Sequence, residues 1–327
     1  MAKYVLITGA SSGIGYETAK VFAARGENVI VTARRTENLE QLKIEIKSEF
    51  PEVDVVVKTC DLSSNAEAIA LYESLKDYEI KAVINKAGRG NKGGFIDDSL
   101  EHTAVIESQR KRLGTKRGFV AVKSNCSLQS YVPALFPLSK FGIKDVLVCT
   151  YQAISGAGKT FATWPEMVDN VIQYIGGEEE KSEKEPLKIW GKVEGDVIVD
   201  ADSPNFTAQC IRVPVSNGHM GAVFVRFENK PSKEEILNIW KDFAGRAQEL
   251  ELPHAPKQFL NYFEEDNMPQ TKLNRDLEGG MAISVGRLRE DTQYDYKFVC
   301  LSHNTLRGAA GGAVLMAELL CAEGYMD

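Results

Sequence analysis

A cysteine near the middle of the chain is the residue best suited to covalent chemistry. Cys126 lies in Ser124-Asn125-Cys126-Ser127, between the apolar run 119–122 and the apolar-rich stretch 128–141. If a strand ends at this cysteine and a helix begins there, the sulfur points at free backbone N–H groups, and the helix dipole lowers the thiol pKa. A thiolate can attack an aldehyde or acyl carbon. We therefore expect Cys126 to be a catalytic nucleophile.

A glycine-rich segment near the N-terminus points to a second chemistry. Thr8-Gly9-Ala10-Ser11-Ser12-Gly13-Ile14-Gly15 follows a predicted strand, 4–7, and opens a predicted helix, 13–24. Glycines there permit a tight turn and let a pyrophosphate approach the helix N-terminus. We expect a dinucleotide to bind here, and the alternative is an ordinary strand–helix turn. The expected contacts are Thr8, Gly9, Ser11, Ser12, Gly13, Ile14 and Gly15.

The ends of the next strands indicate which dinucleotide binds. The second predicted strand ends in Arg34-Arg35, where arginine suits a 2′-phosphate and an acidic residue would suit a ribose hydroxyl. This favours NADP over NAD, although the two arginines could simply be a solvated entry to the following helix. Asp61 ends the third strand and could reach the adenine. The fourth strand ends in Asn85-Lys86-Ala87-Gly88, which adds Asn85, Ala87 and Gly88 to the expected cofactor contacts.

The elements that must position these residues fall into two patterns. Strands at 4–7, 28–33, 54–59 and 81–84 alternate with helices at 13–24, 36–49 and 65–75, which is typical of a doubly wound parallel sheet. Thr36 is the expected cap of the second helix. Further strands at 145–151, 211–215, 222–227, 281–288 and 296–302 indicate an α+β region with a mostly antiparallel sheet. Ser232 and Glu235 form a capping box for a helix at 234–244.

The predicted fold is therefore α/β: a Rossmann-type doubly wound parallel sheet with an inserted α+β catalytic and dimerisation domain. We expect the cofactor domain at residues 1–127 plus 305–327 and the inserted domain at 128–304. The stretch 119–122 is predicted to be a strand, and the prolines after Cys126 should make the next helix short or kinked. The residues from 308 to 321 are predicted to form one helix.

Composition narrows the class of protein. The chain has 327 residues, 43% of them hydrophobic and 26% charged, and a net charge of −7. This charge argues against a surface for nucleic acid or an anionic membrane. No apolar run reaches the ~18–20 residues that span a bilayer, and the early first strand leaves no room for a signal peptide. The six cysteines lack paired spacing, which indicates reduced thiols and a cytoplasmic protein. No metal-ligand spacing is present, so no metal site is expected.

The first part of the chain, about residues 1–95, resembles the short-chain dehydrogenases/reductases. The resemblance rests on the 8–15 segment, on Asp61-Leu62 and on Asn85-Lys86-Ala87-Gly88 in place of that family's Asn-Asn-Ala-Gly. The family's catalytic Tyr-x-x-x-Lys is absent, because the residues four positions after Tyr131 and Tyr151 are Leu135 and Ser155.

From about residue 99 to 327 the chain is similar to the aspartate-β-semialdehyde dehydrogenases. Five motifs occur in that family's order. They are Gln109-Arg110-Lys111-Arg112-Leu113-Gly114-Thr115, Asn125-Cys126-Ser127, Thr150-Tyr151-Gln152-Ala153-Ile154-Ser155-Gly156-Ala157-Gly158, Ile211-Arg212-Val213-Pro214-Val215-Ser216-Asn217-Gly218-His219 and Asn304-Thr305-Leu306-Arg307-Gly308-Ala309-Ala310-Gly311. Two resemblances in one chain suggest a chimera, natural or constructed.

This second resemblance implies roles for particular residues. Cys126 would attack the aldehyde, His219 would be the acid/base partner, Gln152 would orient the intermediate, and Asn125 with the Cys126 N–H would form an oxyanion hole. Arg212 would bind the substrate carboxylate. Glu178 would lie near the substrate amino group and Lys181 on phosphate, although a solvated acidic run is the alternative for both. Arg89 could replace the family's phosphate-binding arginine. Ser155, Gly156 and Gly158 would lie near the nicotinamide, with Asn304 on its carboxamide.

The implied function is reversible NADP-dependent oxidation of L-aspartate-4-semialdehyde with phosphate, giving L-4-aspartyl phosphate. The reaction serves amino-acid biosynthesis, including that of lysine, threonine and methionine. The resemblance also implies a homodimer, with residues 274–280 near the subunit contact. Two alternatives stay open at this stage. One is a short-chain-type carbonyl reductase, and the other is a chimeric fold that binds nucleotide with little or no turnover.

Overall fold

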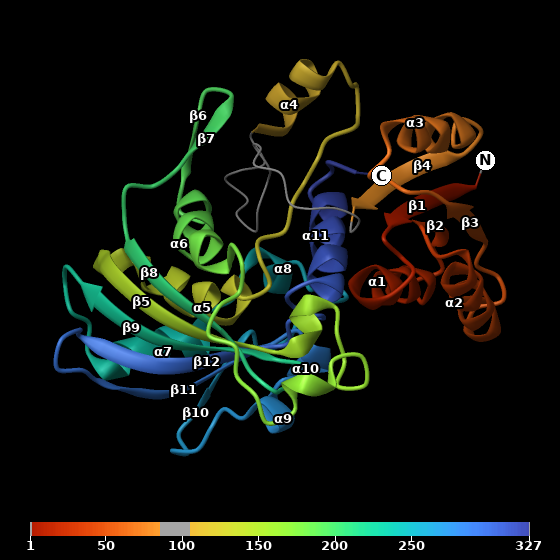
Figure 1. Cartoon of the computed structure of the whole chain (residues 1–327). Coiled ribbons are helices and arrows are strands. Elements are labelled where there is room, and N and C mark those ends of the chain that lie inside the picture. Colours follow the sequence, from red (N-terminus) through yellow and green to blue (C-terminus); the bar gives the residue numbers. More distant parts are fainter. Residues whose placement is uncertain (1, 86–104, 327) are drawn as a thin grey trace. The chain divides into compact units, whose positions relative to one another are not determined.

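The computed structural model describes residues 2–85 and 105–326, which divide into two compact units (Figure 1). The first unit is Met1–Lys92 with Ala317–Asp327, and the second is Gly93–Met316. The predicted domain boundaries, at residues 127 and 305, lie inside this second unit. The predicted cofactor contacts Ala87 and Gly88 and the predicted phosphate contact Arg89 lie outside the described residues.

The first unit is built on a four-stranded parallel sheet in the order β3-β2-β1-β4. Its strands are β1 (Lys3–Thr8), β2 (Asn28–Ala33), β3 (Val55–Thr59) and β4 (Glu79–Asn85), and its helices are α1 (Gly13–Ala23), α2 (Thr36–Glu49) and α3 (Asn65–Ser74). The predicted rhythm of strands and helices is confirmed. The predicted cap of α2 is wrong, because Arg35 is the N-cap and the Thr36 hydroxyl lies 2.8 Å from that of Thr59.

Helices cover both faces of this sheet. Leu71 of α3 and the adjacent Leu75 pack with Leu6 and Ile30 on one face. Val5 and Ile7 alternate with Leu6 and are fully buried on the opposite face. There, α1 contacts β1 and β2, and α2 contacts β2 and β3. This arrangement is that of a doubly wound Rossmann-type sheet.

The second unit contains a six-stranded mixed sheet in the order β10-β11-β12-β9-β5-β8. Its strands are β5 (Ile143–Gln152), β8 (Asn205–Arg212), β9 (His219–Phe227), β10 (Leu260–Phe263), β11 (Ile283–Glu290) and β12 (Tyr296–Ser302). The pairs β5–β8 and β10–β11 are parallel and the other three are antiparallel. The predicted α+β region with a mostly antiparallel sheet is therefore confirmed, although β10 was not predicted.

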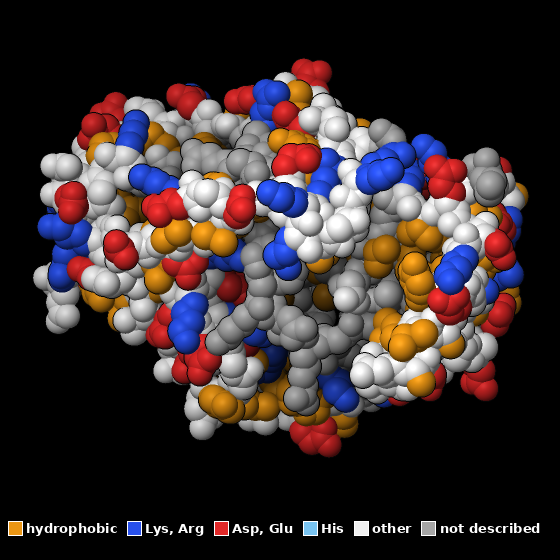
Figure 2. Space-filling view, turned by 90° about the horizontal axis from the view of Figure 1, so that it is seen from above, with side chains coloured by type: hydrophobic (Ala, Val, Ile, Leu, Met, Phe, Trp, Pro, Cys, Tyr) orange, Lys and Arg blue, Asp and Glu red, His pale blue; other side chains and the backbone are white. Residues whose placement is uncertain are grey.

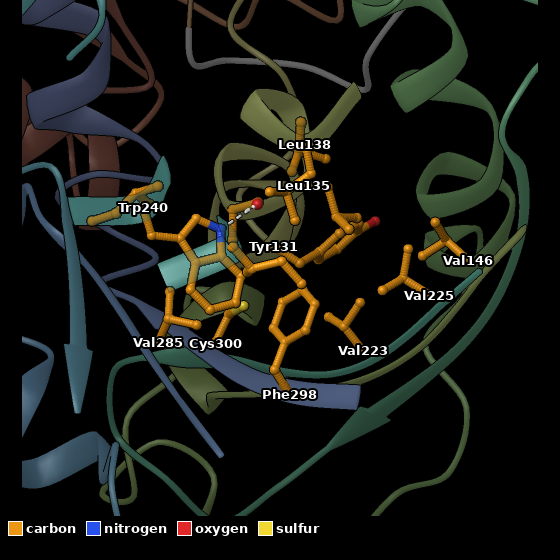
Figure 3. Close-up of a cluster of buried hydrophobic side chains, with 14 of the residues drawn as sticks. Tyr131, Leu135, Leu138, Val146, Val223, Val225, Trp240, Val285, Phe298 and Cys300 are labelled. Carbon is orange, nitrogen blue, oxygen red and sulfur yellow. Dashed lines mark hydrogen bonds between the residues drawn. The ribbon is translucent and has the colours of Figure 1, made fainter. Parts of the chain in front are cut away.

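One face of this sheet carries the main hydrophobic core, shown in Figure 3. Helix α5 (Leu128–Leu135) packs over β9, β11 and β12, helix α6 (Glu178–Ile189) over β8, and helix α7 (Lys233–Asp242) over β10. The fully buried Trp240 donates its indole N–H to the Ala134 carbonyl oxygen at 2.8 Å, and its ring lies edge-on to Phe298 at 5.1 Å. The predicted capping box of Ser232 and Glu235 opens α7.

The opposite face of the same sheet carries a different set of side chains. In cross-strand register, Leu147 and Phe224 are paired, as are Cys149 and Ala222, and Val299 lies beside Ala222. These residues are only half-buried, and they alternate with the core residues that α5, α6 and α7 cover. We call Leu147, Cys149, Met220, Ala222, Phe224 and Val299 the open sheet face.

Two strand predictions in this unit are wrong. Residues 119–122 form no strand beyond a single bridge residue, and the Gln109 side-chain amide bonds both the N–H and the C=O of Val120. The strand predicted at 211–215 instead ends at Arg212, and Pro214 lacks the N–H that a ladder needs.

The second unit also contains several short elements and one long helix. The short elements are α4 (Val105–Leu113), β6 (Lys192–Glu194), β7 (Val197–Val199), α8 (Arg246–Glu249), α9 (Thr271–Asn274), α10 (Leu277–Gly280) and two 3₁₀ helices, Ile154–Ala157 and Pro165–Met167. The long helix is α11 (Ala310–Ala322), whose last residues belong to the first unit. As predicted, α5 is short and contains Pro133, and it continues into a 3₁₀ helix, Phe136–Phe141.

On the face shown in Figure 2, acidic and basic side chains are interspersed. Among residues 2–85 and 105–326, no helix combines the length and the apolar character needed to cross a bilayer.

Candidate functional site

Cys126 lies in a turn that comes directly before α5. The Asn125 side-chain oxygen accepts hydrogen bonds from the Ser127 N–H at 2.8 Å and from the Ser127 hydroxyl at 2.9 Å, and this fixes the backbone on both sides of the cysteine. A side chain at Gly308, just before α11, would lie 2.8 Å from the Cys126 β-carbon. Because Gly308 has no side chain, Cys126 can pack against it.

The predicted thiolate character of Cys126 is wrong for the chain without substrate. Burial and then the Glu178 carboxylate raise the pKa of the Cys126 thiol to about 11, although Lys123 and Arg212 oppose the rise. A buried thiol loses more solvation on ionising than one helix terminus restores. The resting nucleophile is therefore a thiol, and its activation requires a substrate or a proton acceptor.

His219 opens β9 and is fully buried. Its Nδ1 accepts the Ala153 backbone N–H at 3.1 Å, so the ring proton resides on Nε2. Burial, followed by the charge of Arg212, lowers the pKa of His219 to about 3. The Nε2 atom is buried without a hydrogen-bond partner among the described residues. A neutral imidazole with an unpartnered N–H can donate to a substrate oxygen.

Arg212 lies at the end of β8 and approaches the same place. Its Nη1 donates to the Ala153 carbonyl oxygen at 2.7 Å. The Ala153 peptide groups therefore hold both Arg212 and His219, a role that the sequence did not reveal. A β-carbon on Gly156 would lie 2.8 Å from Arg212 Nη1 and 3.0 Å from His219 Nε2. Both nitrogens thus border the small space beside Gly156.

Glu178, the first residue of α6, connects several predicted site residues. Its two oxygens each accept from the Asn125 Nδ2 at 3.1 Å, and it also accepts from Gln152 at 3.4 Å and from Lys181 at 2.9 Å. The side chain of Glu178 is 12% exposed and that of Lys181 is 48% exposed. The hydrogen bond to Glu178 is the main reason that the pKa of Lys181 is raised. The acidic run is thus a helix and not a solvated loop.

These contacts change what Asn125 can do. Its amide donates to Glu178 and its oxygen accepts twice from Ser127, so the side chain already holds the turn around Cys126. The oxyanion-hole role stays a prediction. The turn around Cys126 is also held at Ser124. Gln129 donates to the Ser124 hydroxyl at 2.6 Å, and Arg307 donates to Gln129 at 3.1 Å.

Asn304 lies between two of the predicted site segments. Its Oδ1 accepts the Gly218 N–H at 2.8 Å, and its Nδ2 donates to the Ser155 hydroxyl at 2.9 Å. It therefore joins the turn before His219 to the turn that contains Gly156. Contact with a nicotinamide carboxamide stays a prediction for Asn304, as do the cofactor contacts predicted for Ser155, Gly156 and Gly158.

The first unit contains the predicted dinucleotide turn. Gly9 and Gly13 have φ of 68° and 60°, which favour glycine. A β-carbon on Gly15 would lie 2.5 Å from the Gly9 carbonyl oxygen, so this position tolerates no side chain. Ser12 is the N-cap of α1, and its side chain makes no capping bond. The N-terminus of α1 therefore keeps backbone N–H groups available for a phosphate.

Arg35 gives this turn a positive charge. It donates to the Ser11 hydroxyl at 3.2 Å and to the Ser12 hydroxyl at 2.6 Å, and no carboxylate among the described residues pairs with it. These residues fit the 2′-phosphate of NADP. Arg34 is exposed, and Thr8 donates to the Asn85 side chain at 2.6 Å. The carboxylate of Asp61 accepts two bonds from Ser63, at 3.0 and 2.8 Å, and its contact with the adenine stays a prediction.

Comparisons with known proteins match these two units to two families. A family model described as the dimerisation domain of semialdehyde dehydrogenase matches residues 135–307. A short chain dehydrogenase model matches residues 3–107. The family models therefore support both resemblances seen in the sequence.

Individual relatives extend the likeness. An aspartate-semialdehyde dehydrogenase of Aspergillus fumigatus is 40% identical over 235 residues, which are 69% of this chain and 65% of that protein. The chain thus spans just under two thirds of that relative. The same enzyme of Schizosaccharomyces pombe is 35% identical over 288 residues, 85% of this chain and 80% of that protein. The crystal structure of aspartate semialdehyde dehydrogenase with NADP from Candida albicans matches all of both chains, with a TM-score of 0.77 and 29% identity.

Proposed function

Because the chain belongs to the aspartate-semialdehyde dehydrogenase family, we propose that it oxidises L-aspartate-4-semialdehyde with phosphate to L-4-aspartyl phosphate, reversibly and with NADP. The observation that supports this most is the meeting of Arg212, His219 and Ala153 around Gly156, in the same unit as the Cys126 turn. We propose that this reaction is a step of amino-acid biosynthesis.

In the proposed reaction, the chain's own residues bind the substrate and hold the reacting carbon. Arg212 binds the α-carboxylate, and Glu178 binds the α-ammonium group. The Cys126 sulfur adds to the aldehyde carbon, and the thiol proton ends on the aldehyde oxygen, which gives a thiohemiacetal. His219 Nε2–H donates a hydrogen bond to that oxygen. The base role predicted for His219 requires the other tautomer, with Nε2 free of its proton.

Oxidation and release complete the reaction. When it is bound, NADP would supply the hydride acceptor, and it would be held by Gly9, Gly13, Ser11, Ser12 and Arg35. Loss of hydride and of the hydroxyl proton leaves a thioester on Cys126. Phosphate oxygen then attacks the thioester carbon, the acyl phosphate leaves, and the thiol is restored. Lys181, held by Glu178 and half exposed, is suited to bind that phosphate.

The short-chain reductase alternative lacks its catalytic residues. The Tyr131 hydroxyl is buried and donates to the Ser182 carbonyl oxygen at 3.3 Å, an oxygen left free because Pro186 in α6 has no N–H. Tyr151 has no lysine four residues later. The activity test described next also distinguishes the other alternative, a chimeric fold that binds nucleotide but does not turn over substrate.

That test measures NADPH formation from aspartate semialdehyde with and without phosphate, in the wild type and in Cys126→Ala. We expect phosphate-dependent turnover in the wild type and none in the variant. Tight NADPH binding by a wild type that has no phosphate-dependent turnover would favour the inactive chimera. Turnover by Cys126→Ala would contradict the proposal.

We also propose a cytoplasmic homodimer that buries the open sheet face. Leu147, Ala222 and Phe224 form adjacent apolar positions there, and the matching family model is named for dimerisation. All six cysteines are free, which suits a reducing compartment. Light scattering should give a dimer for the wild type and a monomer for Phe224→Glu. A monomeric wild type would contradict the proposal.

A further inference from the structure

The glutamates of α6 bind specific partners along two sides of the helix. On one side, Glu179 accepts the Gln209 amide at 2.8 Å and the Cys210 backbone N–H at 3.2 Å, and Glu183 accepts the Ala208 N–H at 3.1 Å. Cys210 and Ala208 belong to β8, the edge strand of the six-stranded sheet. These two glutamates therefore satisfy N–H groups that an edge strand leaves unpaired.

The other side of α6 faces the Cys126 turn. Glu178, Lys181, Ser182 and Glu185 are spaced so that they share one face of the helix. The Glu185 carboxylate accepts the Asn125 backbone N–H at 2.8 Å. Since Glu178 holds the Asn125 side chain, two carboxylates two turns apart on one helix hold both the backbone and the side chain of the residue before Cys126.

Helix α6 therefore connects the two segments on which the proposed reaction depends. Through Glu179 and Glu183 it is bonded to β8, which ends at Arg212. Through Glu178 and Glu185 it is bonded to the Cys126 turn. Arg212 is also held without Glu183, because β8 is paired with β5 from Asn205 to Arg212 and is bonded to Glu179 as well. The Asn125 N–H is held by the Glu185 carboxylate, and a carboxylate acceptor makes a stronger bond than a neutral one.

Glu185 itself is half-buried, and no role in the reaction has been assigned to it above. Burial raises the pKa of its carboxyl group, while the Asn125 N–H bond and then Lys181 oppose that rise. Burying a carboxyl group costs free energy unless the group is hydrogen-bonded. The bond from the Asn125 N–H meets that requirement.

We propose that Glu185 is a positioning residue for the nucleophile. By holding the Asn125 N–H, it keeps the Cys126 turn in the conformation from which the sulfur reaches the aldehyde. It does not touch the substrate. The proposal rests on the proposed function, because turnover is one of its readouts, and a misplacement of about 1 Å can cost on the order of a hundredfold in rate.

The test compares Glu185→Ala with Glu185→Gln and with the matched control Glu183→Ala. The control removes a carboxylate bond to a backbone N–H from the same helix, but on the β8 side. In Glu185→Ala we expect kcat to fall at least about tenfold, equivalent to about 1.4 kcal/mol, with KM little changed. Glu185→Gln keeps an acceptor oxygen and should restore kcat to within about threefold of the wild type. Glu183→Ala should keep kcat.

A second readout does not depend on turnover. The rate at which iodoacetamide alkylates Cys126, followed by mass spectrometry of its peptide, should rise in Glu185→Ala, because the released turn exposes the thiol to the reagent. It should stay at the wild-type value in Glu183→Ala. A wild type without turnover would defeat the proposed function, but this comparison would still decide the role of Glu185.

Several results would overturn the proposal. They are an unchanged kcat in Glu185→Ala, an equal loss of kcat in Glu183→Ala, and a Glu185→Gln variant as impaired as Glu185→Ala. If Glu185→Ala does not fold, Glu185→Asp replaces it, since its shorter side chain withdraws the carboxylate from the Asn125 N–H. Wild-type kcat and an unchanged alkylation rate in that variant would equally overturn the proposal.

Discussion

Adding one methyl group at Gly156 should impair catalysis without unfolding the chain. An alanine β-carbon there would lie 2.8 Å from Arg212 Nη1, and 3.0 and 3.1 Å from Nε2 and Cε1 of His219. The φ of Gly156 lies outside the left-handed region, so alanine introduces no backbone strain. Its whole effect should fall on the two side chains that the proposed mechanism places on the substrate.

The size of the effect follows from these distances. Ordinary contacts begin near 3.4 Å, so one or both nitrogens must move by roughly 0.5 Å. Neither moves freely, because Arg212 donates to the Ala153 carbonyl oxygen and His219 accepts from the Ala153 N–H. Since about 1 Å of misplacement can cost on the order of a hundredfold, we expect kcat/KM to fall about tenfold or more.

The assay is steady-state kinetics of Gly156→Ala beside a thermal unfolding curve. The control is Gly195→Ala in the β6–β7 hairpin, where φ is 61° and no atom lies within 4 Å of the new β-carbon. The control should lose about 1 kcal/mol of stability through backbone strain and keep its kcat/KM. A Gly156→Ala enzyme with wild-type kcat/KM and an unchanged Tm would refute the placement of the site beside Gly156.

Three further predictions concern protons and the cofactor. The pKa of His219 is about 3 in the folded chain. Below pH 6.5 the unfolded chain therefore binds more protons at this residue than the folded chain does. As a result, the free energy of unfolding should decrease by at most about 5 kcal/mol between pH 6.5 and pH 3. Urea titrations across that pH range should show that the free energy of unfolding depends less on pH in His219→Asn than in the wild type. An equal pH dependence in the two proteins would contradict the lowered pKa of His219. Because the pKa of the Cys126 thiol is about 11, its alkylation rate should climb with pH to near that value, and a plateau by neutral pH would show a thiolate at rest. Arg35→Ala should weaken NADPH binding about tenfold, or about 1.4 kcal/mol, with NADH binding unchanged in calorimetry. Equal weakening of both would mean that Arg35 does not contact the 2′-phosphate.

The helices and strands of the first unit could be predicted from the sequence because the hydrophobic periodicity and the turn residues indicate the same boundaries there. The strand Asn28–Ala33 and the helix Thr36–Glu49 have the predicted bounds. In the second unit, the edge strands were missed or shifted. Asn205–Arg212 alternates exposed and half-buried residues over most of its length and lacks the apolar period of a core strand. The run 119–122 is apolar throughout and was predicted as a strand, but in the structure the Gln109 side chain bonds the backbone of Val120.

The site could be predicted only as far as side-chain chemistry reveals it. Cys126 and the pair of Glu178 and Lys181 are recognisable by residue type and spacing. Ala153 is not, because it acts through its backbone N–H and C=O. The direction of the Cys126 pKa was missed because burial is a property of the fold. Glu185 had a signal, since it follows Glu178 by seven residues on one helix face.

The central claim is that Cys126 carries the acyl group between oxidation and phosphate transfer. The most direct measurement is a rapid-mixing experiment with aspartate semialdehyde and NADP but no phosphate, followed by mass spectrometry of the intact chain. The account predicts a burst of at most about one NADPH per chain, with an acyl adduct on the Cys126 peptide that phosphate discharges. Continuous NADPH formation without phosphate, or a burst that survives Cys126→Ala, would contradict it.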